Sequence, residues 1–221
     1  GLHNLLEDEV DLVAAAAANG AALHDVRIAS EDYPIASGKK RTGKRVLAIG
    51  TDCSAGKMYT ALALDKSMQA KGMKSTFRAT GQTGILITGS GVPLDAVVAD
   101  FMAGAVEQLT PDNDADHWDI IEGQGSLFHI SYSGVTLALV HGGQPDALII
   151  CHEPTRTHMR GLPDYKLPSM QQLIDTALPL ARFGNPECQV VGISVNTQHM
   201  SEDEAVAYLA KVEAEFCLPT V

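Results

Sequence analysis

Residues 45–57 read Arg45-Val46-Leu47-Ala48-Ile49-Gly50-Thr51-Asp52-Cys53-Ser54-Ala55-Gly56-Lys57. The stretch begins with an uninterrupted apolar run, which is typical of a strand that is covered on both faces. Two glycines, at positions 50 and 56, then flank a short polar loop, and an amphipathic helical pattern starts at Lys57. In such a loop several backbone N–H groups turn inward, and the helix N-terminus and the lysine add positive charge. The stretch therefore predicts a phosphate-binding loop.

The loop departs from the strict Gly-x4-Gly-Lys-Ser/Thr pattern at two positions. Thr51 stands where the first glycine belongs, and Met58 replaces the hydroxyl residue that normally holds Mg²⁺. Thr60 follows two residues later on the helix, where we expect its side chain to point elsewhere. The loop therefore favours phosphate binding over Mg²⁺-dependent ATP cleavage. The predicted cofactor-binding residues of the loop are Gly50, Thr51, Asp52, Cys53, Ser54, Ala55, Gly56 and Lys57.

The residues that follow predict an α/β domain. Short apolar runs alternate with amphipathic helical patterns, which is the rhythm of a parallel sheet with crossover helices. We expect strands at residues 45–49, 74–79, 119–121, 147–151 and 189–195, and helices at 57–70, 94–109, 133–141, 169–183 and 201–216. The predicted fold class is α/β, with a mostly parallel sheet covered by helices on both faces.

Residues 1–44 are predicted to be a helix and a linker ahead of this domain. Residues 4–22 carry an alanine-rich helical pattern that stops near Gly20, and residues 24–28 resemble a short strand. The polar linker at 30–44 ends in a basic cluster that is either a solvated surface or an attractant for an anionic ligand. Because the chain starts at Gly1 and ends in what reads as a new strand, we expect residues 1–44 to end a missing domain and the P-loop domain at 45–221 to be truncated.

The composition excludes several functions. The formal net charge is −11 and no basic stripe compensates for it, which argues against nucleic-acid binding. No apolar stretch is long enough for a membrane span, and the first residues do not form a signal peptide. The four cysteines are widely spaced, as expected of reduced thiols in a cytosolic protein. We expect a cytoplasmic homo-oligomer without nucleic-acid or membrane partners.

Polar loops follow several of the predicted strands. The carboxyl ends of parallel strands share one edge of the sheet, where ligands bind. The loop at 151–161 is dense in polar side chains and carries two arginines, which suits a small molecule with a carboxylate or a phosphate. Cys151, His152 and His158 do not have the spacing of a zinc site, so no metal is predicted. The predicted substrate-binding residues are Gln82, Thr83, Gln124, Ser126, Arg156, His158 and Arg160.

The Gly-Thr-Asp-x-x-x-Gly-Lys form of the loop resembles dethiobiotin synthetase and its relatives in the signal-recognition/MinD-like branch of P-loop proteins. Residues 117–126, His117-Trp-Asp-Ile-Ile-Glu-Gly-Gln-Gly-Ser126, are similar to the strand of those enzymes that ends in Glu-Gly-x-Gly. The resemblance implies that Glu122 lies beside the phosphates and a metal or acts as a base, and that Asn196 reads a nucleobase. An ordinary helix cap at Glu122 and an Asx turn at Asn196 are the alternatives.

Five motifs together resemble one bacterial family that was long catalogued as a domain of unknown function and that includes D-glutamate N-acetyltransferase. The resemblance covers nearly the whole chain. The motifs are Gly50-Thr-Asp-Cys-x-x-Gly-Lys, Ala79-Thr-Gly-Gln-Thr-Gly-Ile-Leu-Ile, Glu122-Gly-Gln-Gly-Ser-Leu, Tyr132-Ser-Gly-Val-Thr-Leu and Cys151-His-Glu-Pro-x-Arg-Thr-His-x-Arg-Gly.

This family resemblance implies acetyl transfer from acetyl-CoA to the amine of D-glutamate or a similar amino acid. The loop would hold the phosphates of CoA without a metal, and Arg156 and Arg160 would meet the two substrate carboxylates. Glu122, His129 or His152 would then remove a proton from the attacking ammonium group. Two alternatives stay open: a ligase or carboxylase that uses ATP and Mg²⁺, like dethiobiotin synthetase, and a non-catalytic nucleotide-binding module.

Overall fold

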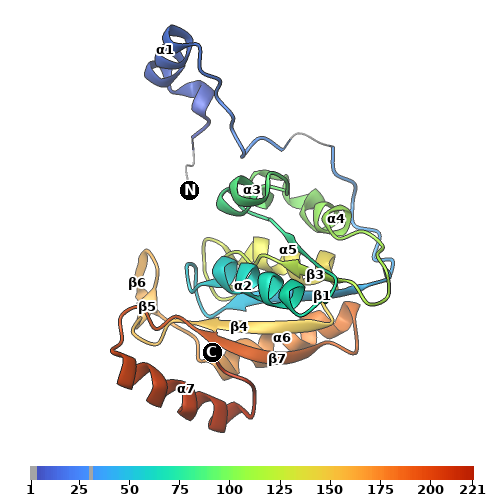
Figure 1. Ribbon diagram of the computed structural model, residues 1–221, viewed down its shortest axis with the longest axis vertical. Coiled ribbons are helices and arrows are strands. Elements are labelled where there is room, and N and C mark those ends of the chain that lie inside the picture. The colour runs from blue at the N-terminus through green and yellow to red at the C-terminus, as the bar shows by residue number, and fades with distance from the viewer. Residues whose placement is uncertain (1–3, 30–31) are drawn as a thin grey trace.

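The computed structural model describes residues 4–29 and 32–221. Its body is a five-stranded parallel sheet in the order β2-β3-β1-β4-β7, with helices on both faces (Figure 1). The strands are β1 (Lys44–Gly50), β2 (Ser75–Arg78), β3 (Trp118–Ile121), β4 (Ala147–His152) and β7 (Gln189–Val195). The helices of the body are α2 (Lys57–Ala70), α3 (Gln82–Thr88), α4 (Ala99–Leu109), α5 (Ser133–Gly143), α6 (Met170–Gly184) and α7 (Glu202–Phe216). The predicted fold class is therefore confirmed.

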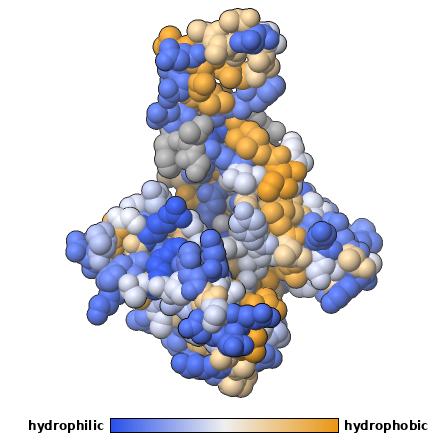
Figure 2. Space-filling model, turned by 60° about the vertical axis from the view of Figure 1, so that its left-hand side comes forward, coloured by the Kyte–Doolittle hydropathy of each residue, from blue (hydrophilic) through white to orange (hydrophobic). Residues whose placement is uncertain are grey.

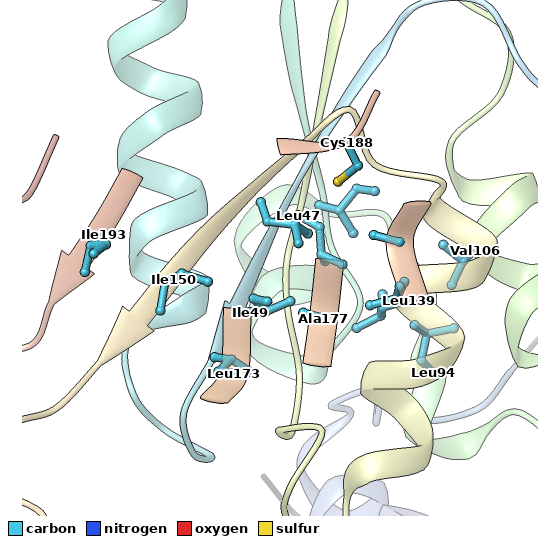
Figure 3. Close-up of a cluster of buried hydrophobic side chains, with 14 of the residues drawn as sticks. Leu47, Ile49, Leu94, Val106, Leu139, Ile150, Leu173, Ala177, Cys188 and Ile193 are labelled. Carbon is cyan, nitrogen blue, oxygen red and sulfur yellow. The ribbon is translucent and has the colours of Figure 1, made fainter. Parts of the chain in front are cut away.

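The central strand β1 connects two apolar cores, because its side chains alternate between the two faces of the sheet. Leu47 and Ile49 belong to the larger core, where they lie with residues of β4, α5 and α6 (Figure 3). Val46 faces the other way, toward Ala61 and Met68 of α2. Both faces of β1 are thus covered, as its uninterrupted apolar run predicts.

Several predicted elements differ from the structure. Residues 24–28 form turns instead of a strand, and the helix expected at 94–109 is divided into the 3₁₀ turn η2 (Leu94–Ala96) and α4. The N-terminal pattern is divided into η1 (Leu6–Asp8) and α1 (Val10–Asn19). The short helix α3 and the hairpin of β5 (His158–Met159) and β6 (Leu162–Lys166) were not predicted, because neither is long enough to show a period.

The end of the chain does add to the sheet. Thr220 forms a parallel bridge with Ile193 of β7. The Ile193 N–H donates to the Pro219 carbonyl at 2.9 Å, and the Val221 N–H donates to the Ile193 carbonyl at 3.0 Å. The last residues therefore pair like the start of a further strand, as their sequence indicates.

The basic cluster, at residues 39–45, runs from the linker into the start of β1. It is partly buried and lies at the amino edge of the sheet, opposite the phosphate loop. The Arg45 side chain is 1% exposed, and its guanidinium donates to the carbonyls of Arg41 and Thr42. Arg41 donates to the carbonyls of Glu107 and Gly142. These two arginines hold the linker against the body, so the cluster does not supply an anion site beside the loop.

The N-terminal segment consists of a projecting helix and a linker that is attached to the body. Helix α1 buries none of its residues and lies apart from the sheet (Figure 1), and its apolar side chains are open to solvent (Figure 2). The parts of the predicted segment at residues 1–3 and 30–31 lie outside the described residues. No helix in the described part of the chain is both long and apolar enough to cross a membrane.

The linker at residues 34–38 packs closely on α4. The Glu107 carboxylate accepts the backbone N–H groups of Ser37 and Gly38, each at 2.8 Å. A Cβ placed on Gly104 would meet the Pro34 carbonyl oxygen at 1.8 Å, so this position in α4 needs glycine for the linker to fit.

We expect Gly104→Ala to lower the free energy of unfolding by about 1–3 kcal/mol, because the added methyl group clashes with rigid backbone. The matched control is Gly134→Ala in α5, where a Cβ meets no atom within 4 Å. The control should gain about 0.5–1 kcal/mol from helix propensity alone. Urea unfolding measures both changes, and a gain in both variants would contradict the docked linker.

Candidate functional site

The carboxyl edge of the sheet opens into one cavity of about 910 Å³, within the range of about 300–1,000 Å³ that is common for small-molecule sites. It lies between the phosphate loop, the start of α3, the end of β3 and the segment at residues 153–161, which leads into and includes the turn of the β5–β6 hairpin and is called the hairpin loop below. The predicted site residues that line it are Cys53, Ser54, Gly56, Lys57, Gln82, Thr83, Glu122, Gln124, Arg156, Arg160 and Asn196. Gly50, Thr51, Asp52, Ala55, Ser126, His129, His152 and His158 are not among its lining residues in the described part of the chain.

The phosphate loop has the strand–loop–helix geometry that its sequence predicts. Gly56 has a φ of 104° and precedes α2, and no side chain caps the first N–H groups of this helix. Lys57 is 5% exposed, and its Nζ donates to the Asp52 carbonyl at 2.8 Å. Burial lowers the pKa of Lys57. Uncapped helix N–H groups beside a lysine form a site that attracts a phosphate.

Glu122 lies at the end of β3 on the floor of the cavity and is 5% exposed. Its Oε2 accepts the N–H groups of Thr80 at 2.8 Å and of Gly81 at 3.1 Å, just before α3. Burial raises the pKa of Glu122, and these two hydrogen bonds and the charge of Lys57 oppose the rise. Glu122 thus holds the backbone just before α3 and also presents a carboxylate with a raised pKa to the cavity, which suits a general base.

The two arginines of the hairpin loop have different surroundings. Arg156 is half-buried: Nη1 donates to Asp52 Oδ2 at 2.7 Å and to the Cys53 carbonyl at 2.6 Å, and Nη2 pairs with Glu153. Arg160 is exposed, and its guanidinium has no hydrogen bond or ion pair within residues 4–29 and 32–221. Two carboxylates therefore occupy Arg156, whereas Arg160 is available to an anionic ligand.

The three histidines in the predicted site lie away from the cavity wall. His129 is 1% exposed and fully bonded: Nε2 donates to the Arg160 carbonyl at 3.0 Å, and Nδ1 accepts the Ser131 N–H at 3.2 Å. His152 Nδ1 is 2.9 Å from Thr51 Oγ1, and burial lowers the pKa of His152. His158 is exposed beside Thr157 on the hairpin. Neither His129 nor His152 is among the described residues that line this cavity, whereas Glu122 is.

Ser126 and Asn196 support the loops at the cavity. Ser126 is fully buried, and its Oγ donates to the Thr51 carbonyl at 3.2 Å. Asn196 Oδ1 accepts the Gln198 N–H at 3.1 Å, which is an Asx turn, and Asn196 also borders the cavity. Both interpretations of Asn196 that the sequence left open are therefore compatible with its position.

Other cavity residues were not predicted. They are Met58, Tyr59, Asp95, Tyr132, Val135, Glu153, Gln198 and His199, together with neighbouring glycines. Tyr59 is 74% exposed and also borders a second cavity of about 380 Å³, with Thr60 and Ser194. Because Tyr59 comes only two residues after Lys57, its position in the sequence already indicates that it lies near the phosphate loop. Asp95 comes from η2 and pairs with Arg27 at 3.2 Å, a contact that only the tertiary structure creates.

One group of side chains could be mistaken for a metal site. Ligand atoms of Asp52, Cys53 and His129 lie within 4.8 Å of one another. Asp52 is already paired with Arg156, and both ring nitrogens of His129 have partners. A nearby guanidinium and an occupied imidazole are unfavourable for a cation, so we interpret this group as a hydrogen-bonded junction.

Comparisons with known proteins agree with this geometry. A family model described as "Domain of unknown function (DUF1611_C) P-loop domain" matches residues 34–221. A D-glutamate N-acetyltransferase of Tritonibacter scottomollicae is 74% identical over 221 residues, which are 100% of this chain and 66% of that protein. The crystal structure of a DUF1611 family protein from Anabaena variabilis has a TM-score of 0.89 at 39% identity, covering 100% of this chain and 65% of its own. The chain thus spans slightly less than two thirds of these relatives.

A more distant structure supports the P-loop fold. Cobyrinic acid a,c-diamide synthase from Mycobacterium smegmatis, solved with ADP and magnesium, has a TM-score of 0.51. It is 13% identical, and the match covers 80% of this chain and 84% of that one. At this identity the likeness concerns the fold alone.

The opposite pKa shifts of two glutamates predict opposite effects of pH on stability. The pKa of Glu122 is raised from 4.5 by burial, so the stability it contributes is present below pH 4.5 and is lost as pH rises through the raised pKa. Glu122→Gln should therefore gain stability relative to the parent protein as pH rises above 4.5.

The matched variant is Glu204→Gln. Hydrogen bonds from Ser201 lower the pKa of Glu204 from 4.5, so its stabilising effect is present above pH 4.5 and is lost as pH falls through the lowered pKa. This variant should be less stable than the parent at neutral pH, and the difference should shrink in acid. Urea midpoints from about pH 2.5 to pH 8 measure both variants, since the Glu204 effect is lost below pH 4.5, and parallel profiles would contradict the assignment for Glu122.

Proposed function

The chain belongs to the DUF1611 family of P-loop domains, and from this premise we propose that it is an enzyme that transfers acetyl from acetyl-CoA to the amine of D-glutamate. One observation carries the proposal: the phosphate loop, Glu122 and Arg160, whose guanidinium has no partner among the described residues, line the same cavity. The name of the 74% identical relative supports the choice of substrate. We place the reaction in the cytoplasm, in line with the free state of all four cysteines.

The cavity fits the phosphate-bearing part of CoA. Lys57 and the uncapped N–H groups at the start of α2 would hold the diphosphate. The adjoining cavity beside Tyr59 and Asn196 would take the adenine, because an exposed aromatic ring offers a stacking surface. Bound acetyl-CoA supplies an activated thioester carbonyl.

The loop is suited to hold these phosphates without Mg²⁺. Met58 occupies the position of the usual metal-binding hydroxyl. The hydroxyl of Thr60 donates to the Gly56 carbonyl at 3.1 Å and lies 2.9 Å from Ser194 Oγ, so it faces β7. This arrangement favours CoA over Mg-ATP as the ligand.

Arg160 and Glu122 take the two roles on the amino-acid side. Arg160 binds a carboxylate of D-glutamate through its unpaired guanidinium. Glu122 removes a proton from the ammonium group, and the freed amine forms a C–N bond to the acetyl carbon. The C–S bond breaks and Glu122 gives one proton to the leaving thiolate, while the second proton that the nitrogen loses on forming the amide passes to solvent. The products are N-acetyl-D-glutamate and CoA, and Glu122 ends the cycle unchanged.

We expect Lys57→Met to abolish calorimetric binding of acetyl-CoA while the fold is retained, since methionine keeps the buried volume and removes only the charge. The control is Lys66→Met, an exposed lysine of the same helix, which should bind normally. Binding of acetyl-CoA by the parent protein should not depend on Mg²⁺. Tight binding of Mg-ATP alone would instead favour the ligase alternative.

We expect Glu122→Gln to lower kcat by about 100- to 10,000-fold, as for loss of a general base, with little change in the Kd of acetyl-CoA. In the parent protein, kcat/KM should fall as pH falls through a pKa above 4.5, because burial raises the pKa of Glu122. Thiol release from acetyl-CoA in the presence of D-glutamate measures the rate. Binding of acetyl-CoA and D-glutamate without thiol release in the parent protein would instead identify a non-catalytic module.

A further inference from the structure

We infer that Asp52, although it lies within the phosphate loop, serves the amino-acid side of the site by positioning Arg160. This inference rests on the proposed function, in which Arg160 binds a substrate carboxylate. Sequence reasoning assigned Asp52 to cofactor binding because of its place in the loop motif. The contacts of its side chain point to a different role.

The Asp52 carboxylate faces away from the cavity and is buried. The residue is 1% exposed and is not among the cavity-lining residues in the described part of the chain. Its Oδ1 accepts the Cys53 N–H at 2.7 Å. Its Oδ2 accepts two donors from the hairpin loop: Arg156 Nη1 at 2.7 Å and the Arg160 N–H at 2.8 Å.

These bonds fasten the hairpin loop to the phosphate loop. Arg156 also donates to the Cys53 carbonyl and pairs with Glu153, so it bridges the two loops. The Arg160 backbone is held on both sides, because its N–H bonds to Asp52 and its carbonyl accepts His129 Nε2 at 3.0 Å. The Arg160 side chain thus projects into the cavity from a fixed backbone position.

The Asp52 carboxylate also makes the ion pairing of Arg156 different from that of Arg160. Arg156 pairs with two carboxylates, Asp52 and Glu153, whereas the Arg160 guanidinium has no ion-pair partner within residues 4–29 and 32–221. A substrate carboxylate therefore meets one available cation at a defined place. Losing the charge of Asp52 would loosen the Arg160 backbone and leave Arg156 less firmly held.

The turn of the phosphate loop depends much less on this charge. Lys57 Nζ bonds to the backbone carbonyl of residue 52, which every substitution retains. In Asp52→Asn the single oxygen can face either the two hairpin donors or the Cys53 N–H, and the NH₂ group then faces the other side and accepts no bond there. In both orientations the charge that pairs with Arg156 is lost.

We expect Asp52→Asn to raise the KM for D-glutamate by about 10- to 100-fold, in line with the loss of charge-assisted hydrogen bonds. The Kd for CoA should change less than twofold. Amide hydrogen exchange, measured by mass spectrometry on peptides across residues 158–166, should become faster. Arg160→Ala provides the comparison, because its change in the KM for D-glutamate shows the effect of losing the carboxylate contact directly.

The matched control is Asp146→Asn at the opposite edge of the sheet. Asp146 accepts the Arg45 N–H at 2.8 Å and an Asn185 N–H at 2.9 Å, so this variant also loses a hydrogen-bonded carboxylate. It should lower stability and leave the KM for D-glutamate unchanged. If Asp52→Asn fails to fold, Asp52→Ser provides the same measurements, because its short neutral side chain reaches neither arginine.

Weaker CoA binding with an unchanged KM for D-glutamate would overturn the inference and return Asp52 to the cofactor side. The positioning role of Asp52 can still be tested if the parent protein does not acetylate D-glutamate, a result that would contradict the proposed function. In that case exchange across residues 158–166 and the affinity of ADP for the phosphate loop are compared. Faster exchange with unchanged ADP affinity supports the positioning role, and unchanged exchange refutes it.

Discussion

The parallel pairing of β1 with β3 and β4 is the constraint on which the site depends. Leu47 is in register with Ile121, and Gly50 is in register with Cys151. Three chain segments that are far apart in sequence therefore leave the sheet at one edge. The pairing continues beyond the strands, since the Thr51 N–H donates to the Cys151 carbonyl at 3.1 Å. The phosphate loop, Glu122 and the hairpin loop are neighbours because of this register.

The buried charged side chains that this register brings together are compensated by groups near them. Lys57, Glu122 and Asp52 are each at most 5% exposed, so each needs compensation from nearby dipoles or charges. Lys57 donates to a backbone carbonyl, Glu122 accepts two backbone N–H groups, and Asp52 pairs with Arg156. The Arg160 guanidinium differs from these three groups, because it has neither a hydrogen bond nor an ion pair within residues 4–29 and 32–221.

Much of the fold was predictable because its signals are local. The buried strands are short apolar runs, and the helices begin with recognisable residues such as Ser201, which forms a capping box with Glu204. The errors occurred where local signals are weak. Helix α3 spans only seven residues, and the hairpin strand β5 only two. Residues 25–28 alternate polar and apolar side chains as a strand does, but no neighbouring strand pairs with residues 24–28 in the described structure.

By itself the sequence determined the phosphate loop, the α/β class and the polar edge, because a glycine-flanked loop after a buried strand has few other structures. Only the tertiary structure decided which of the predicted polar residues face the cavity. His129 and Arg160 were both predicted site residues, yet one is buried and fully bonded and the other is exposed. Asp52 sits in the phosphate motif but bonds to the hairpin. Such differences arise from contacts between distant segments, which no local pattern encodes.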